Sequence, residues 1–161
     1  MPEALDFSRD AQDWPNRAAS RIVETPGIRW HVQIAGSGPP LLLLHGTGAS
    51  THSWAELIPH LSRQFTVVAP DLPGQGFTRI TGRRDVSMTG MARALRELLN
   101  TLALEPRHAV GHSAGAALLA RMSLDGQLDP HSIVAINGAF VPFGGVVTRL
   151  FAPLAKLLTL N

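Results

Sequence analysis

The chain has 161 residues, of which 45% are hydrophobic and 16% are charged, with a formal net charge of +2 and no cysteine. This composition is typical of a packed globular domain, and it excludes a disordered chain, disulfide bonds, zinc–thiolate sites and a cysteine nucleophile. Apart from Arg83-Arg84 the arginines are scattered, so we expect no nucleic-acid partner.

Residues 1–16 form a polar arm that leads into the motif DWPNR. The arm contains acidic residues and no apolar core of signal-peptide length, so we expect a cytoplasmic protein. Two predicted strands follow, SRIVET and IRWHVQI, separated by the turn residues Pro26-Gly27. The alternating pattern of the second predicts a half-exposed antiparallel pair at a sheet edge.

From residue 41 onward, strand and helix patterns alternate. The predicted strands are LLLLH, FTVVAPD, RHAVGHS and SIVAIN, and the predicted helices between them are SWAELIPHL, residues 87–102 and AGAALLARMSL. This order predicts right-handed βαβ units and a mostly parallel sheet with flanking helices, an α/β fold.

The helix SWAELIPHL carries signals for both its start and its interruption. Ser53 and Glu56 have the spacing of a capping box, and Pro59 predicts a kink or an early end. The residues expected on its apolar face are Trp54, Leu57, Ile58 and Leu61.

The segment GHSAG, residues 111–115, places Ser113 between two glycines where a strand passes into a helix. A sharp turn of this kind projects a serine hydroxyl above the sheet, and side chains at Gly111 and Gly115 would collide with the neighbouring strand and helix. The alternative is that Ser113 only caps the helix. The position of the motif between an apolar strand and an apolar helix favours Ser113 as a catalytic nucleophile.

The segment HGTG, residues 45–48, follows the first buried strand. An acyl-transfer site needs two backbone N–H donors for the oxyanion, one after the nucleophile and one from this neighbouring loop. We therefore predict Ala114 and Thr47 as the oxyanion donors, with His45 and Gly46 in structural roles.

The motifs LLLLHGTGAS, VVAPDLPGQGFT and VGHSAGAAL, in this order and spacing, resemble the α/β-hydrolase superfamily. The resemblance matches Asp71, Gly74 and Gly76 to the family's Asp-x-x-Gly-x-Gly loop and implies an ester or similar acyl substrate. More narrowly, the stretch from DWPNR to Trp54 resembles the magnesium-chelatase accessory proteins of bacteriochlorophyll biosynthesis. That likeness implies a role in magnesium insertion into protoporphyrin IX, with a porphyrin and magnesium-chelatase subunits as partners.

The base of a catalytic triad is not found by the same reasoning. His131 precedes the strand SIVAIN and therefore lies at the opposite edge of the sheet, roughly 20 Å from Ser113. His108 begins its own strand at that edge, His112 is expected to line or pack the pocket, and His31 is placed on an edge strand. His52 is the one histidine that we expect could overhang the site.

The acid is missing as well. Asn137 ends the strand SIVAIN, where some superfamily members carry the acid, and an amide cannot supply the charge. Asp125 and Asp129 fall in the turn before that strand, at the wrong edge, and Asp71 is expected to be structural. The spacing of His108 and His112 does not support a metal site, and we expect no cofactor.

We therefore expect an incomplete α/β-hydrolase core over residues 17–138, without its C-terminal strands, and the start of a helical cap over residues 139–161. Arg149, Pro153 and Lys156 interrupt the apolar C-terminal stretch, which predicts a buried or surface-lying helix and no transmembrane segment. Three functions stay open: an accessory factor for magnesium insertion, a serine esterase, and a fragment without independent function.

Overall fold

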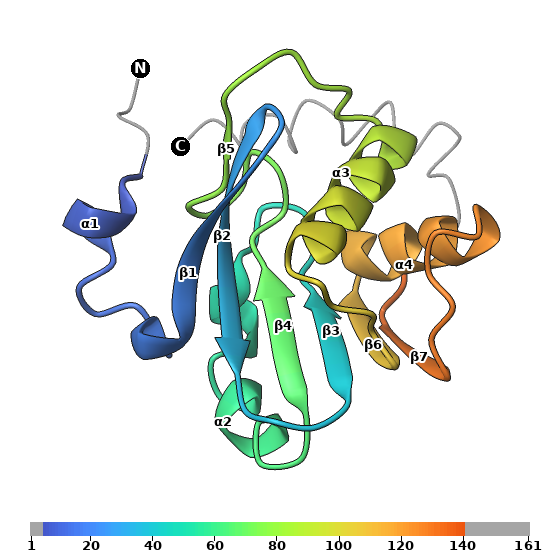
Figure 1. Cartoon of the computed structure of the whole chain (residues 1–161), viewed down its shortest axis with the longest axis horizontal. Coiled ribbons are helices and arrows are strands. Elements are labelled where there is room, and N and C mark those ends of the chain that lie inside the picture. The colour runs from blue at the N-terminus through green and yellow to red at the C-terminus, as the bar shows by residue number, and fades with distance from the viewer. Residues whose placement is uncertain (1–4, 141–161) are drawn as a thin grey trace, which may run out of the picture.

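The computed structural model describes residues 5–140 and contains one mixed sheet with helices on both faces (Figure 1). The strands are β1 (Ser20–Thr25), β2 (Ile28–Ala35), β3 (Pro40–Leu44), β4 (Thr66–Pro70), β5 (Arg79–Ile80), β6 (His108–His112) and β7 (Ser132–Ile136). Their order across the sheet is β1-β2-β4-β3-β6-β7, and the two-residue β5 pairs with β2.

The parallel part of the sheet is confirmed as predicted. Strand β3 is parallel to β4 and to β6, and β6 is parallel to β7, whereas β2 is antiparallel to β1 and β4. All four parallel strands therefore end at the same edge of the sheet, where the loops that follow β3, β4, β6 and β7 gather.

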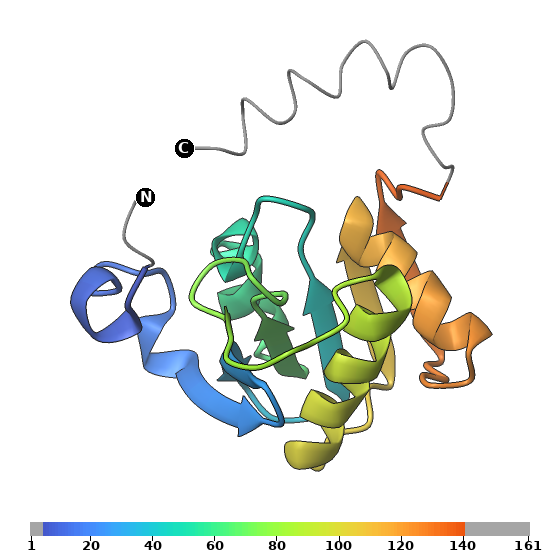
Figure 2. The same ribbon diagram turned by 90° about the horizontal axis from the view of Figure 1, so that it is seen from above.

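Helices cover the two faces of the sheet. The helical elements are α1 (Phe7–Asp10), η1 (Arg17–Ala19), η2 (Thr51–Trp54), α2 (Leu57–Leu61), α3 (Met88–Thr101) and α4 (Ala114–Leu124). Figure 2 shows α3 and α4 together on one face, with η2 and α2 on the other. Helix α3 begins where expected, because the Ser87 side chain accepts a hydrogen bond from the Gly90 amide.

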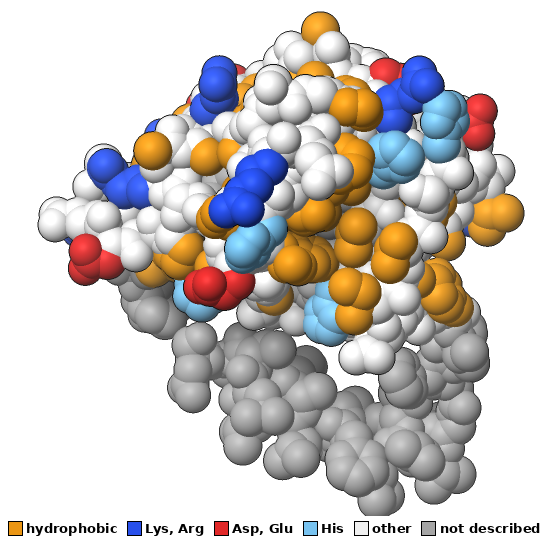
Figure 3. Space-filling model, turned by 90° about the horizontal axis from the view of Figure 1, so that it is seen from below, with side chains coloured by type: hydrophobic (Ala, Val, Ile, Leu, Met, Phe, Trp, Pro, Cys, Tyr) orange, Lys and Arg blue, Asp and Glu red, His pale blue; other side chains and the backbone are white. Residues whose placement is uncertain are grey.

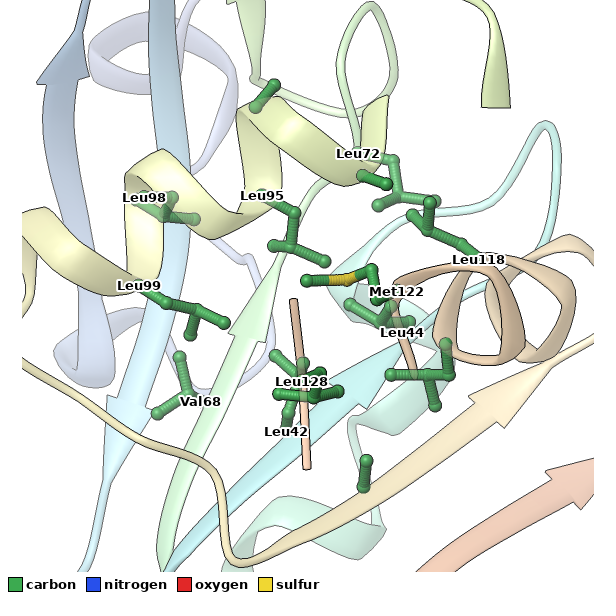
Figure 4. Packing of buried hydrophobic residues seen from close by; sticks show 14 of the residues in the cluster. Leu42, Leu44, Val68, Leu72, Leu95, Leu98, Leu99, Leu118, Met122 and Leu128 are labelled. Carbon is green, nitrogen blue, oxygen red and sulfur yellow. The ribbon is translucent and has the colours of Figure 1, made fainter. Parts of the chain in front are cut away.

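The unbroken apolar run of β3 is explained by burial on both faces. Leu42 and Leu44 belong to the core beneath α3 and α4, whereas Leu41 and Leu43 pack with Trp54 on the opposite face. Figure 4 shows the first of these cores, in which side chains of β3, α3 and α4 point toward one another. Because both faces of β3 are covered, no polar alternation is needed along it.

The prediction for β2 was wrong in one respect, because this strand is internal and largely buried. Trp30 and Val32 face the core under α3, as an alternating pattern requires. The polar residues on the other face, His31 and Gln33, are also buried, because the N-terminal arm covers them. Gln33 Nε2 donates a hydrogen bond of 2.6 Å to the Pro15 carbonyl oxygen in that arm.

The helix expected over SWAELIPHL is split into η2 and α2. The first segment is capped by Ser50, whose hydroxyl accepts from the His52 amide, and not by Ser53 as predicted. Trp54 and Ile58 are buried, but Leu57 is 44% exposed and does not belong to the apolar face. Pro59 lies inside α2, which has five residues.

Within residues 5–140, no helix is long and apolar enough to cross a membrane. The apolar stretch that predicts a C-terminal helix lies outside the described residues, as does most of the segment expected to begin a cap. The division at residues 16 and 138 stays a prediction.

Candidate active site

Ser113 lies at the sharp junction of β6 and α4 and has a strained backbone. Its φ of 51° and ψ of −115° lie in a region that residues with a side chain rarely adopt. The surrounding chain fixes both of its backbone groups: the amide donates to the Ile136 carbonyl at 2.9 Å, and the carbonyl accepts from the Ala139 amide at 3.2 Å. The Ser113 side chain makes no capping hydrogen bond to α4, which argues against the simple cap.

The two glycines of the motif are required by space. A Cβ atom at Gly111 would lie 2.5 Å from the Ala116 nitrogen, and one at Gly115 would lie 2.3 Å from the Leu44 carbonyl oxygen. The first contact is with the helix and the second with β3, as the sequence predicts. The close approach of α4 to the sheet holds Ser113 at the edge where the parallel strands end.

The loop after β3 reaches the same point. A Cβ atom at Gly46 would lie 3.2 Å from the Ser113 Cβ and 3.0 Å from the His112 Nδ1, so this loop can approach the serine closely because residue 46 has no side chain. Within the described part of the chain, the amides of Thr47 and Ala114 have no hydrogen-bond acceptor. Thr47 follows Gly46 in the chain and Ala114 follows Ser113, so both predicted oxyanion donors adjoin residues of this close approach, and their role as donors stays a prediction.

His45 holds two of these loops together. Its Nε2 accepts a hydrogen bond of 2.9 Å from the Leu72 amide, so its Nδ1 carries the proton and donates to the Gly46 carbonyl at 2.8 Å. Burial lowers the pKa of His45, an effect partly opposed by the bond to Gly46 and by the charge of Asp71. Both ring nitrogens are occupied by backbone, which fits the structural role that we predict for this residue.

Among the described residues, none of the remaining histidines is hydrogen-bonded to the Ser113 hydroxyl. His108 pairs with Ser132 at the beginning of the parallel strands, and the amide of His131 bonds the Arg107 carbonyl at that same edge. His52 is exposed, and its ring packs against Trp14 of the N-terminal arm, with 5.7 Å between the ring centroids. Within residues 5–140, no histidine makes a hydrogen bond to the Ser113 hydroxyl.

Asp71 is the centre of a buried network that sequence reasoning largely missed. Its carboxylate accepts hydrogen bonds from the amides of Thr51 (2.6 Å) and Phe77 (2.8 Å), and it lies 2.8 Å from His31 Nδ1. The other ring nitrogen of His31 lies 2.9 Å from the Ser20 hydroxyl. His31 is fully buried in this chain of polar groups. The prediction that it lies on an edge strand was wrong, because β2 lies between β1 and β4.

Gly76 explains the glycine pattern of the loop around Asp71. It has a φ of +52°, and a Cβ atom there would come within 2.1 Å of the Asp71 carboxylate. The next loop is tied in as well, because the Gly48 amide donates to Gln75 Oε1 at 2.7 Å. Gln75 gave no signal in the sequence, because its role depends on a loop that is 27 residues away.

The loop after β7 lies next to the serine and carries no acid. Asn137 is exposed and has a φ of 47°. It follows Ile136, whose carbonyl accepts a hydrogen bond from the Ser113 amide. Across the described residues, no group of three or more metal-ligating side chains could hold a metal ion. The geometry present is thus a strained serine beside free backbone donors.

The chain is similar in sequence to known proteins. The sequence profile of the alpha/beta hydrolase fold matches residues 39–143. The magnesium-chelatase 30 kDa subunit of Rhodobacter capsulatus is 40% identical over 146 residues, covering 89% of this chain and 51% of that protein. The fluoroacetate dehalogenase of a Burkholderia species is 38% identical over 120 residues, covering 72% of this chain and 38% of that protein.

Solved structures share the fold. An alpha/beta hydrolase fold protein from Burkholderia ambifaria superposes with a TM-score of 0.72 at 26% identity, covering 88% of this chain and 55% of that one. The chain spans about half or less of the length of the curated relatives that it matches.

Proposed function

The chain belongs to the alpha/beta hydrolase fold family, and from this premise we propose that it is an accessory factor for the insertion of magnesium into protoporphyrin IX in bacteriochlorophyll biosynthesis. The observation that carries the proposal is the 40% identity to the magnesium-chelatase 30 kDa subunit, which extends over 89% of the chain. Because one fold hosts many activities, the fold by itself cannot decide the function.

The site supports a binding role for the serine turn. Thr47 and Ala114 offer unused amides, and the N-terminus of α4 adds a favourable dipole for negative charge. Protoporphyrin IX carries carboxylates, and one of them would accept hydrogen bonds from these amides and from the Ser113 hydroxyl. Such a contact orients the macrocycle without any covalent step, so it needs no base.

A magnesium-chelatase assay tests the accessory role. We expect addition of the chain to increase the rate of magnesium insertion, and titration of protoporphyrin IX to shift its absorption band. The variant Ser113→Ala keeps both backbone amides and retains most of each effect. An unchanged spectrum together with an unchanged insertion rate would overturn the proposal.

A serine hydrolase is the second candidate, favoured by the backbone of Ser113. A strained conformation at a residue with a side chain persists where function requires it. In this role Ser113 attacks an acyl carbonyl, and the amides of Thr47 and Ala114 hold the oxyanion that forms. Hydrolysis also requires a base and an acid, and within the described residues the Ser113 hydroxyl has no hydrogen bond to a histidine or a carboxylate.

Hydrolysis of p-nitrophenyl acetate separates the two candidates. Ester cleavage that disappears in Ser113→Ala supports the hydrolase, whereas cleavage that survives this substitution rules out Ser113 as its nucleophile. Absence of cleavage, combined with stimulated magnesium insertion, is the result that we expect.

A further inference from the structure

A cleft lies at the edge of the sheet where the parallel strands begin, on the far side from Ser113. Its cavity volume is about 510 Å³, and its walls come from the loops that precede β3, β6 and β7. These loops are joined by backbone hydrogen bonds, because Arg107 donates to the Pro40 carbonyl and accepts from the His131 amide, both at 2.8 Å. The cleft therefore has a fixed frame.

The charged groups of this cleft leave one positive charge uncompensated. Glu105 is paired with Arg96, whose Nη1 lies 2.9 Å from the carboxylate. Arg107 lines the cleft as well, and its guanidinium has no ion pair or hydrogen bond with any described residue. Most other arginines described in the structure have an ion pair or a hydrogen bond. The exceptions outside this cleft are Arg21, Arg63, Arg83 and Arg17, and the Arg17 guanidinium lies over the Phe7 ring.

Two imidazoles line the same cleft as Arg107. The rings of His108 and His131 lie 6.1 Å apart at an angle of 84°. Nδ1 of His108 is engaged with the Ser132 hydroxyl at 2.8 Å, which leaves Nε2 for a ligand, and the His131 ring has no hydrogen-bond partner within residues 5–140. Figure 3 views the molecule from the end at which the parallel strands begin and shows histidine side chains beside basic and acidic ones on that face.

The remaining walls of the cleft are apolar. They are formed by Pro39, Pro40, Ala103 and Leu104. An unpaired guanidinium and two hydrogen-bonding imidazoles over apolar walls match a ligand with one anionic end and one apolar end. We propose that this cleft binds a small organic anion, a carboxylate or phosphate attached to a compact apolar body.

Isothermal titration of the purified chain with benzoate and phenyl phosphate tests the proposal, with benzyl alcohol as the uncharged probe. We expect both anions to bind and benzyl alcohol to bind at least about 10-fold more weakly. The variant Arg107→Ala removes the guanidinium and lowers the affinity for the anions by about 10-fold or more. The tighter of the two anions identifies the carboxylate or the phosphate as the group that the cleft accepts.

Two further variants test whether the anions bind in the cleft itself. Arg83→Ala removes the same charge from an exposed loop outside the cleft and leaves the affinities unchanged, and His131→Asn changes an exposed cleft residue and weakens binding without Arg107 being altered. Equal weakening by Arg83→Ala and Arg107→Ala, or no anion binding up to 10 mM (roughly 3 kcal/mol of affinity), overturns the proposal. Arg107→Ala and His131→Asn change the cleft and leave Thr47, Ser113 and Ala114 untouched, so weaker anion binding in these variants assigns the site to the cleft whatever the outcome for the proposed function.

Discussion

At the scale of single residues, Ser113 keeps a backbone conformation that its own side chain disfavours. The cost is of order 1–3 kcal/mol, and hydrogen bonds to Ile136, Ala116 and Ala139 hold the residue in place. The contacts of Gly46, Gly111 and Gly115 leave the chain no room to relax the turn. Strain of this kind is stored by the fold around the serine.

Replacement of Ser113 by glycine and by alanine separates strain from the loss of the hydroxyl. Both variants remove the hydroxyl, but glycine adopts a positive φ without steric cost whereas alanine does not. We expect Ser113→Gly to be more stable than Ser113→Ala by about 1 kcal/mol, measured by urea unfolding. Equal stability of the two variants would mean that the turn is not strained.

His45 gives the fold a dependence on pH. Burial lowers the pKa of His45 below its ordinary value of 6.5, so the folded state takes up its proton less readily than the unfolded chain. Stability is therefore complete above pH 6.5 and falls as the pH drops below that value toward the folded pKa.

The variant His45→Gln isolates this contribution, because glutamine does not titrate. We expect the free energy of unfolding of the wild-type chain to fall more steeply between about pH 7 and pH 5 than that of the variant, as followed by urea unfolding at each pH. Parallel pH profiles for the two chains contradict the assignment.

At the scale of elements, the N-terminal arm is part of the packed fold. Trp14 donates a hydrogen bond from Nε1 to the Thr51 hydroxyl at 3.1 Å, and its ring packs against Phe77 with 4.8 Å between centroids. Phe7 also reaches His31, at 4.9 Å between ring centroids. The arm thereby closes the polar chain of Asp71 and His31 against water.

Two substitutions of Trp14 measure what the arm contributes. Trp14→Phe keeps an aromatic ring but loses the donor to Thr51, which we expect to cost about 1 kcal/mol. Trp14→Ala also removes the ring contacts and costs roughly 1–2 kcal/mol more. Thermal or urea unfolding of the two variants measures both losses of stability. If the arm does not contribute to the packed fold, neither variant will be less stable than the wild-type chain.

The helices and strands were largely predictable from the sequence, because the spacing of apolar residues and the turn residues determine structure over short stretches of chain. The strand and helix around Ser113 lie where the pattern places them, and so does the helix that starts after Ser87. The position of β2 inside the sheet was not predictable, because the burial of His31 depends on the distant arm. The split at Trp54 was missed for a different reason, because Ser50 caps the first segment in place of Ser53.

At the scale of the whole molecule, the parts of the site differ in how far the sequence reveals them. Ser113 and its glycines form one local motif, and their steric contacts follow from it. The hydrogen bonds of Gln75 and Asp71 join loops that are far apart in the chain. Composition and hydrophobic periodicity are local properties, so they could not predict these bonds. Local chemistry was therefore predictable, and the way in which loops hold one another was not.

The outer edge of β7 has no strand partner among the described residues, and the strand exposes Ile133, Val134 and Ile136. It carries no charge and no proline, the features by which proteins usually protect a sheet edge from pairing. We therefore expect the 161-residue chain to self-associate as its concentration rises, measured by light scattering after size-exclusion chromatography.

A lysine on this edge should reduce the association. Val134 is 51% exposed, so Val134→Lys places a charge on the edge without burying it, and the charge opposes pairing with a second copy. The matched control is Val86→Lys, which makes the same change at a valine that is 57% exposed and lies in the loop before α3. If the β7 edge drives association, the apparent mass at high concentration falls for Val134→Lys and stays at the wild-type value for Val86→Lys. An equal decrease in both variants would assign the association to net charge, and a wild-type chain that stays monomeric throughout would show that the edge is protected.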